Sequence, residues 1–271
     1  MRLIYITNKI TLATYAINVG ADRIMVDLEK IGKFERQGNA NTLISDHTIA
    51  DVQEMSRAIG PSSLLVRINP LNCESLNEIE KIISIGVKSI MMPMFEDTSD
   101  VIKFIEFINK RCEVCLLLET KKALDTIEDW SSLKGISEVH VGLNDLHIQL
   151  GQNFMFELMF NGVVDKIASV LRNRGIPFGI GGIAPLGNGD LNSQNILMKH
   201  ASIGSTSTIL SRSFHRQAQT VSELKNLGFS DLITDVKRYF EYCLTLGRKQ
   251  YSENDMESKK IIRRIISNQH T

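Results

Sequence analysis

The stretch Cys115-Leu116-Leu117-Leu118-Glu119-Thr120 is an apolar run that closes on an acid. A second run of the same kind, Val139-His140-Val141-Gly142-Leu143-Asn144, is followed by Asp145. Continuous apolar runs of this length are typical of strands buried on both faces of a parallel sheet. An acid at the carboxyl end of such a strand points into the mouth of an α/β barrel, where those folds keep their chemistry. The two acids therefore predict both a barrel and a site.

Strand-like runs alternate with amphipathic helical stretches about eight times along the chain, which predicts a (β/α)8 barrel of the TIM type. The expected strands are Leu3–Ile6, Arg23–Asp27, Leu64–Ile68, Ser89–Met92, Val114–Glu119, Glu138–Gly142, Pro177–Gly181 and Ser202–Leu210. Expected helices between them include Ser75–Ile85, Ser99–Asn109, Met155–Arg174 and Asn192–His200.

The chain continues past the eighth unit, so we expect a barrel over residues 1–230 and a C-terminal helical extension over residues 231–271. Asp231–Lys249 is one helical stretch, and Ile261, Ile262, Ile265 and Ile266 follow among charged residues. On a helix these isoleucines need a surface to cover them, and the chain's own barrel and a neighbouring subunit are alternatives. The second alternative predicts a homo-oligomer.

Composition narrows the class of partner. Lys plus Arg and Asp plus Glu each number 31, so the formal net charge is zero and nothing favours nucleic acid or an anionic membrane. No apolar run approaches the roughly 20 residues of a spanning helix, and the apolar start Met1–Thr7 is too short for a signal peptide. We expect a cytoplasmic protein that acts on a small molecule.

Glu119 and Asp145 are hard oxygen ligands of the kind that suits Mg²⁺ or Mn²⁺. The alternative is that each acid caps a following helix. Gly142 allows backbone to come close to a ligand, and the amides around Asn144 are candidates to hold a substrate carboxylate.

Arg67 ends a third run, Leu64–Asn69, and a buried guanidinium requires an anionic partner. It suits a carboxylate or an enolate oxygen. Asp27 and Glu29 end the second strand, and their spacing of two places them on one side of an extended backbone. For Arg67 the alternative is a structural ion pair with either acid. For the two acids the alternatives are a helix cap and a salt bridge to Lys30 or Lys33.

His147 lies two residues after Asp145 and is the histidine best placed for proton transfer. A structural role is the alternative for it.

Together these stretches resemble the metal-dependent pyruvate aldolase and citrate lyase β-subunit family, in the phosphoenolpyruvate/pyruvate barrel superfamily. The similar stretches occur in the family's order and are Gly20–Glu29, Val66–Asn69, Met91–Met94, Leu118–Thr120, Gly142–Leu146 and Leu150-Gly151.

The resemblance implies Mg²⁺ or Mn²⁺ on Glu119 and Asp145, Arg67 beside a keto oxygen, and Asp27 and Glu29 in the acidic motif of the second strand. It also implies a 2-oxo acid substrate, or an acyl-CoA thioester in the citrate lyase branch.

Two motifs bear on the branch. Pro93-Met94 looks like the aldolase branch, with Pro93 near the substrate, whereas Lys33-Phe34-Glu35-Arg36 looks like the lyase branch. Two departures affect proton transfer: Lys30 stands where the aldolases usually have a histidine, and Leu117 stands where a glutamine is common.

Three functions follow. The first is a carbon–carbon lyase that acts through an enolate of a 2-oxo acid or related acyl substrate. The second is an acyl-CoA thioester lyase or hydrolase. The third is a non-catalytic barrel that binds a carboxylate.

Overall fold

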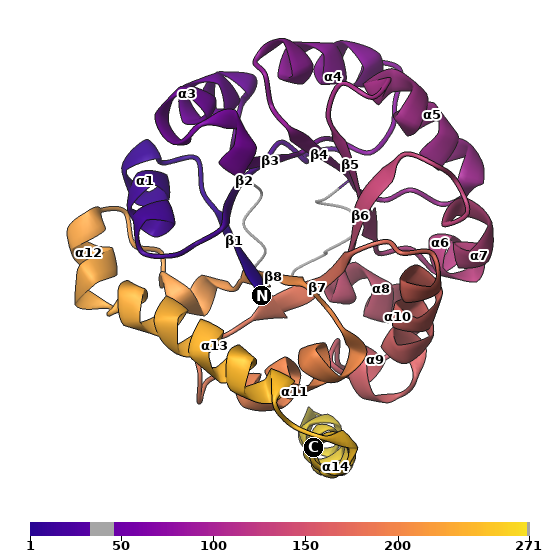
Figure 1. Ribbon diagram of the computed structural model, residues 1–271, viewed down its shortest axis with the longest axis vertical. Coiled ribbons are helices and arrows are strands. Elements are labelled where there is room, and N and C mark those ends of the chain that lie inside the picture. Colours follow the sequence, from indigo (N-terminus) through magenta and orange to yellow (C-terminus); the bar gives the residue numbers. More distant parts are fainter. Residues whose placement is uncertain (33–45, 270–271) are drawn as a thin grey trace.

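Eight parallel strands form a closed barrel in the computed structural model, which describes residues 1–32 and 46–269 (Figure 1). The strands are β1 Arg2–Ile6, β2 Arg23–Asp27, β3 Leu64–Arg67, β4 Ser89–Met92, β5 Glu113–Leu118, β6 Ile136–Val141, β7 Phe178–Ile183 and β8 Ser207–Leu210. Each strand pairs with the next, and β8 returns to β1 through Thr208 opposite Leu3. The predicted (β/α)8 barrel is confirmed.

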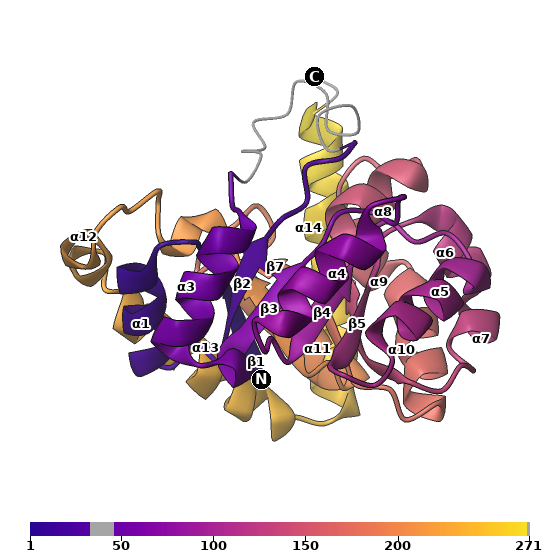
Figure 2. The same cartoon turned by 90° about the horizontal axis from the view of Figure 1, so that it is seen from above.

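Helices surround the barrel on the outside (Figures 1 and 2). They are α1 Ile10–Asn18, α3 Ile49–Ile59, α4 Ser75–Ser84, α5 Thr98–Ile108, α6 Lys121–Asp125, α7 Ile127–Trp130, α8 Leu143–Gln149, α9 Glu157–Phe160, α10 Val163–Asn173, α11 Ser193–Ile203, α12 Val221–Asn226, α13 Phe229–Leu244 and α14 Arg248–Gln269. Among the described residues, no helix is both long enough and apolar enough to cross a bilayer.

The core has two parts because strand side chains alternate in direction. The larger part fills the space between strands and helices. The smaller part lies inside the barrel and consists of Ile4, Met25, Leu65, Met91, Cys115 and Leu117. These six side chains are almost fully buried, so the barrel interior is packed and is not a pore.

The C-terminal extension packs on the chain's own barrel. Helix α14 runs along one side of the barrel and lies against α9 and α11 (Figure 2). Ile262 is buried there, and Ile261, Ile265 and Ile266 pack against the core with part of their surface exposed. The isoleucines thus find a surface within the chain, and the homo-oligomer stays a prediction.

A buried lysine fastens α14 to the barrel. The Lys199 ammonium lies 2.8 Å from Asp165 of α10 and 3.1 Å from Asp255 of α14. Its side chain is only 3% exposed, so the two carboxylates supply the charge compensation that burial demands.

Three predicted elements were wrong in extent. The helix expected over Met155–Arg174 is two helices, separated where Gly162 adopts a φ of 96°. The strand expected over Ser202–Leu210 begins at Ser207, because α11 continues to Ile203 and ends at the left-handed Gly204. The helix expected over Asp231–Lys249 ends at Leu244, and α14 begins at Arg248.

Candidate active site

The carboxyl ends of three strands bring polar side chains to one end of the barrel. Asp27 is the last residue of β2, Arg67 is the last residue of β3, and Glu119 directly follows β5. Asp27 and Arg67 are partners in the β2–β3 register. Since all strands are parallel, these side chains share the same mouth.

Arg67 forms a two-pronged ion pair with Asp27. Its Nε donates to Asp27 Oδ1 at 2.8 Å and its Nη2 donates to Asp27 Oδ2 at 2.7 Å. Its Nη1 lies 3.3 Å from Glu29 Oε2. Burial alone would lower the pKa of Arg67, but the attraction and hydrogen bonds of Asp27 and the charge of Glu29 raise it overall. Arg67 is therefore a fixed cation, and the structural ion pair considered from the sequence is present.

Glu119 is a buried carboxyl group with a strongly raised pKa. It is 3% exposed. Burial raises the pKa of Glu119 to about 8; Arg67 opposes this rise, while the carboxylates of Glu29 and Asp145 add to it. The backbone N–H of Met94 donates to Glu119 Oε1 at 3.1 Å. A buried carboxyl group beside two other acids is a site where a cation would be favoured.

Gly142 lies directly against Glu119. A Cβ on this glycine would come within 2.9 Å of both Glu119 Cβ and Glu119 Oε2. The Gly142 N–H donates to Leu118 O at 2.9 Å, which fixes the glycine beside the strand. The glycine thus makes room for Glu119, whereas the sequence predicted room for a ligand.

Asp145 and its neighbours lie on α8. Asp145 is in the first turn and is half-buried, and Asn144 before it is exposed. The Asp145 carboxylate is close enough to Glu119 to raise the pKa of that group. His147 lies two residues further along α8, about half a helical turn from Asp145, with its Nδ1 3.2 Å from the carbonyl oxygen of Leu143.

The two predicted metal ligands suit a divalent cation chemically, because both offer hard oxygen donors and the pKa of one, Glu119, is raised by burial and by the nearby acids. In residues 1–32 and 46–269, no group of three or more His, Cys, Asp or Glu side chains stands ready to hold a metal. A cation on Glu119 and Asp145 would thus complete its coordination with water or substrate oxygens, as Mg²⁺ commonly does.

Pro93 is buried in the loop after β4, next to Met94. The Met94 amide is a contact that sequence reasoning missed, since no side-chain pattern marks a backbone donor. His47 was also missed: its Nδ1 accepts the backbone N–H of Asp27 at 2.9 Å. The stretch Lys33-Phe34-Glu35-Arg36 lies outside the described residues.

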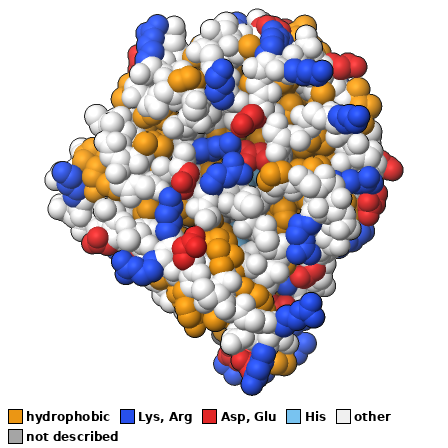
Figure 3. All heavy atoms as spheres, viewed as in Figure 1, with side chains coloured by type: hydrophobic (Ala, Val, Ile, Leu, Met, Phe, Trp, Pro, Cys, Tyr) orange, Lys and Arg blue, Asp and Glu red, His pale blue; other side chains and the backbone are white. Residues whose placement is uncertain are grey.

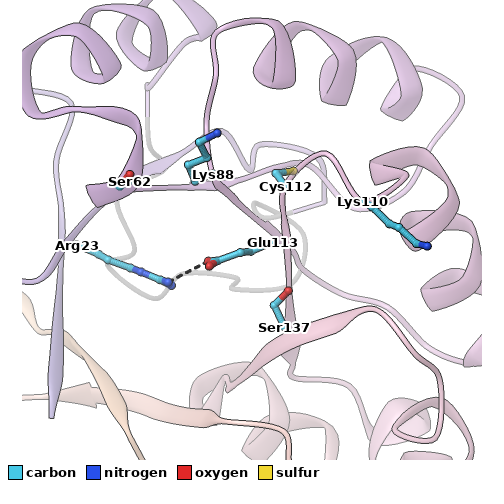
Figure 4. A pocket seen from close by; sticks show the side chains of 7 residues that line it. All are labelled: Arg23, Ser62, Lys88, Lys110, Cys112, Glu113 and Ser137. Atoms are coloured by element: carbon cyan, nitrogen blue, oxygen red, sulfur yellow. Dashed lines mark hydrogen bonds and ion pairs between the residues drawn. The ribbon is translucent and has the colours of Figure 1, made fainter.

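A hollow of about 440 Å³ opens at the opposite end of the barrel (Figure 4). Arg23 and Glu113 point toward each other there, 3.1 Å apart, and they begin the strands whose other ends carry Asp27 and Glu119. The hollow lacks any group of the acidic motif, so we place the candidate site at the mouth.

The sequence and the fold are similar to those of known proteins. The sequence matches the family described as HpcH/HpaI aldolase/citrate lyase over residues 4–171, which is more than half of the chain. No curated protein matches the sequence significantly.

Solved structures share the fold at low sequence identity. An HpcH/HpaI aldolase/citrate lyase family protein from Burkholderia cenocepacia has 13% identity and a TM-score of 0.63, with 88% of this chain and 94% of that chain covered. CitE from Mycobacterium tuberculosis, in complex with magnesium and pyruvate, has 13% identity and a TM-score of 0.63, with 94% and 97% covered. The citrate lyase β subunit of M. tuberculosis, with oxaloacetate and magnesium, has 16% identity and a TM-score of 0.58, with 83% and 95% covered.

Proposed function

Since the chain belongs to the HpcH/HpaI aldolase/citrate lyase family, we propose that it is a divalent-metal-dependent carbon–carbon lyase that acts through an enolate of a 2-oxo acid or a related acyl substrate. The observation that carries the proposal is Glu119. This buried carboxyl group has its pKa raised to about 8 beside Asp145 and Glu29, in reach of the charge of Arg67.

Glu119 and Asp145 are the residues that would hold Mg²⁺ or Mn²⁺, and the bound ion would supply Lewis-acid stabilisation of negative charge on substrate oxygens. Structures of relatives that hold magnesium with pyruvate or oxaloacetate support this choice of ion and ligand class.

Arg67 is the group that stabilises the oxyanion. Its Nε and Nη2 donate to Asp27 and its Nη1 lies 3.3 Å from Glu29, and we propose that its remaining N–H groups bind a substrate oxygen. Because Asp27 holds the guanidinium in one orientation, the donors are in place before charge develops, which is the condition for effective catalysis by electrostatics. We assign Asp27 and Glu29 to positioning Arg67.

Proton transfer completes the reaction. In the cleavage direction a base takes the proton of a substrate hydroxyl, the adjacent carbon–carbon bond breaks, and its electron pair becomes the enolate of the 2-oxo acid. A proton delivered to the enolate carbon then gives the product. The candidates for the base are His147, a carboxylate of the mouth and a water molecule. The histidine that aldolases usually have is not among them, because Lys30 stands at its position. Gly142, Asn144 and Pro93 are the proposed neighbours of the substrate.

Exchange of the methyl protons of pyruvate with deuterated water tests the proposal, because it needs enolate formation and no knowledge of the second substrate. Proton NMR should show exchange with Mg²⁺ or Mn²⁺, none with chelator, and none in Arg67→Ala. Exchange that continues undiminished in Arg67→Ala would refute the role of Arg67.

A screen of 2-oxo acids and acyl-CoA thioesters, with Mg²⁺ and then with chelator, distinguishes the alternatives. Cleavage of thioesters alone would favour the acyl-CoA lyase or hydrolase. Lys121 and Lys122 would be candidates to bind the phosphates of CoA, but Lys121 pairs with Asp125 and Lys122 pairs with Glu96, as exposed helix-start residues do. Binding of a 2-oxo acid without turnover would favour a carboxylate-binding barrel.

A further inference from the structure

The loop after β4 contains a residue in an unusual backbone conformation. Met94 has a φ of 55°, in the left-handed region that residues with a side chain rarely adopt. Its N–H is directed at Glu119 Oε1, 3.1 Å away. We infer that Met94 is a positioning residue for Glu119: the left-handed turn aims its backbone N–H so that the carboxylate is held ready for a divalent cation. The inference rests on the proposed function, since it assigns Glu119 to that cation.

Both neighbours of Met94 are anchored, so the turn cannot relax easily. Pro93 is buried and has a fixed φ. The Phe95 ring packs edge-on against Trp130 with centroids 5.3 Å apart. The carbonyl oxygen of Phe95 accepts from the hydroxyl of Thr120 at 2.7 Å. Thr120 directly follows Glu119, so the loop is tied both to the carboxylate and to the residue beside it.

Glu119 is confined from a second direction by Gly142, whose Cα leaves no room for a Cβ next to Oε2. One carboxylate oxygen therefore meets the Met94 N–H and the other lies against Gly142. This arrangement limits rotation of the carboxylate in the absence of any ligand. Supports of this kind around a metal ligand typically change metal affinity by roughly 10- to 100-fold when they are removed.

The contact uses the backbone of Met94, so the side chain at position 94 matters only through the backbone conformation that it allows. What matters at position 94 is tolerance of a left-handed φ, not size or polarity. Glycine tolerates this conformation best, asparagine tolerates it well, and β-branched valine tolerates it poorly.

The experiment measures Mn²⁺ affinity by calorimetry in the full-length protein for wild type, Met94→Gly, Met94→Asn and Met94→Val. Met256→Val is the matched control, because it makes the same substitution on α14 at a side chain that is 56% exposed. We expect Met94→Gly, Met94→Asn and Met256→Val to remain within about threefold of wild type. Met94→Val should bind at least about 10-fold more weakly. If Met94→Val does not fold, Met94→Ala takes its place and should weaken binding more than Met94→Gly.

A stable, folded metal-free Met94→Val with wild-type affinity would overturn the inference, as would an equal loss in all three Met94 variants, which would point to the side chain. If the wild type itself binds no Mn²⁺, the proposed metal site fails before Met94 is in question.

Discussion

The two ends of the barrel both carry charged side chains, but the described residues use them differently at each end. At the end where the strands begin, Arg2 donates to Glu138 at 2.8 Å, and Arg23 pairs with both Glu138 and Glu113. Two cations thus meet two anions, and acidic and basic groups gather at the centre of this face (Figure 3).

At the mouth, Arg67 lies among the carboxylates of Asp27, Glu29 and Glu119, and Asp145 lies close enough to Glu119 to affect its pKa. Asp27 and Glu29 use Arg67 as a partner, and Glu119 remains with a pKa raised to about 8. An end that serves only stability can pair its charges internally, whereas a buried carboxyl group with a strongly perturbed pKa marks a candidate site for an ion or a substrate.

Replacing Arg67, the buried cation that pairs with Asp27, should have the largest effect. Arg67→Lys keeps the charge but loses the planar fork that grips Asp27. We expect turnover to fall roughly 100- to 1,000-fold, with a much smaller change in Mn²⁺ affinity. Steady-state kinetics and calorimetry check this, and turnover within twofold of wild type would make Arg67 purely structural.

Gly142→Ala should disturb the mouth without changing any charge. The new Cβ would lie 2.9 Å from Glu119 Oε2, so the carboxylate must move. We expect Mn²⁺ affinity to fall roughly 10- to 100-fold. Gly182→Ala is the matched control, because its Cβ would have nothing closer than 3.5 Å. Equal affinity in the two variants would show that Glu119 does not need this space.

The raised pKa of Glu119 should make the free energy of unfolding depend on pH. The pKa of Glu119 is raised from 4.5 to about 8, so between these values the folded state holds a proton that the unfolded state has released. Unfolding free energy of the metal-free protein should therefore fall as pH rises through this range.

The cleanest window is pH 6.5 to 8, because burial lowers the pKa of His140 to about 4 and that of His200 to about 3, and their contributions change only below 6.5. We expect a loss of roughly 1–2 kcal/mol across this window that is absent in Glu119→Gln. Denaturant unfolding at each pH measures it; identical profiles for the two proteins would contradict the raised pKa.

Removing the ion pairs of Glu138 at the opposite end of the barrel should have the smallest effect and leave the mouth intact. Glu138→Gln removes the anion shared by Arg2 and Arg23 but keeps an acceptor. We expect a loss of about 1 kcal/mol in stability and Mn²⁺ affinity within twofold of wild type. A marked loss of affinity would mean that the two ends are coupled.

The fold was largely predictable because buried parallel strands appear in the sequence as continuous apolar runs. Seven of the eight expected strands begin and end within two residues of the observed strands. The errors in element boundaries arose where a glycine determines the end of a helix. Gly162 and Gly204 adopt left-handed φ values that end or separate helices, and the local apolar pattern does not reveal this.

The site was predictable to the level of strand ends. The period of two places Asp27, Arg67 and Glu119 in the mouth, and the structure brings all three together. The division of labour among them was not predictable, because which carboxylate pairs with Arg67 depends on three-dimensional register. The same period, followed backward from Asp27 to Arg23 and from Glu119 to Glu113, would have indicated the charged pair at the other end.

The packed layer of Ile4, Met25, Leu65, Met91, Cys115 and Leu117 separates the two ends and blocks passage along the barrel axis. A small molecule that reaches the mouth must leave by the way it entered. Because the mouth has one entrance, a bound molecule prevents the next one from binding until it dissociates. A product that stays bound in the mouth would therefore compete with the next substrate molecule. Product release would then limit the turnover rate whenever dissociation is slow.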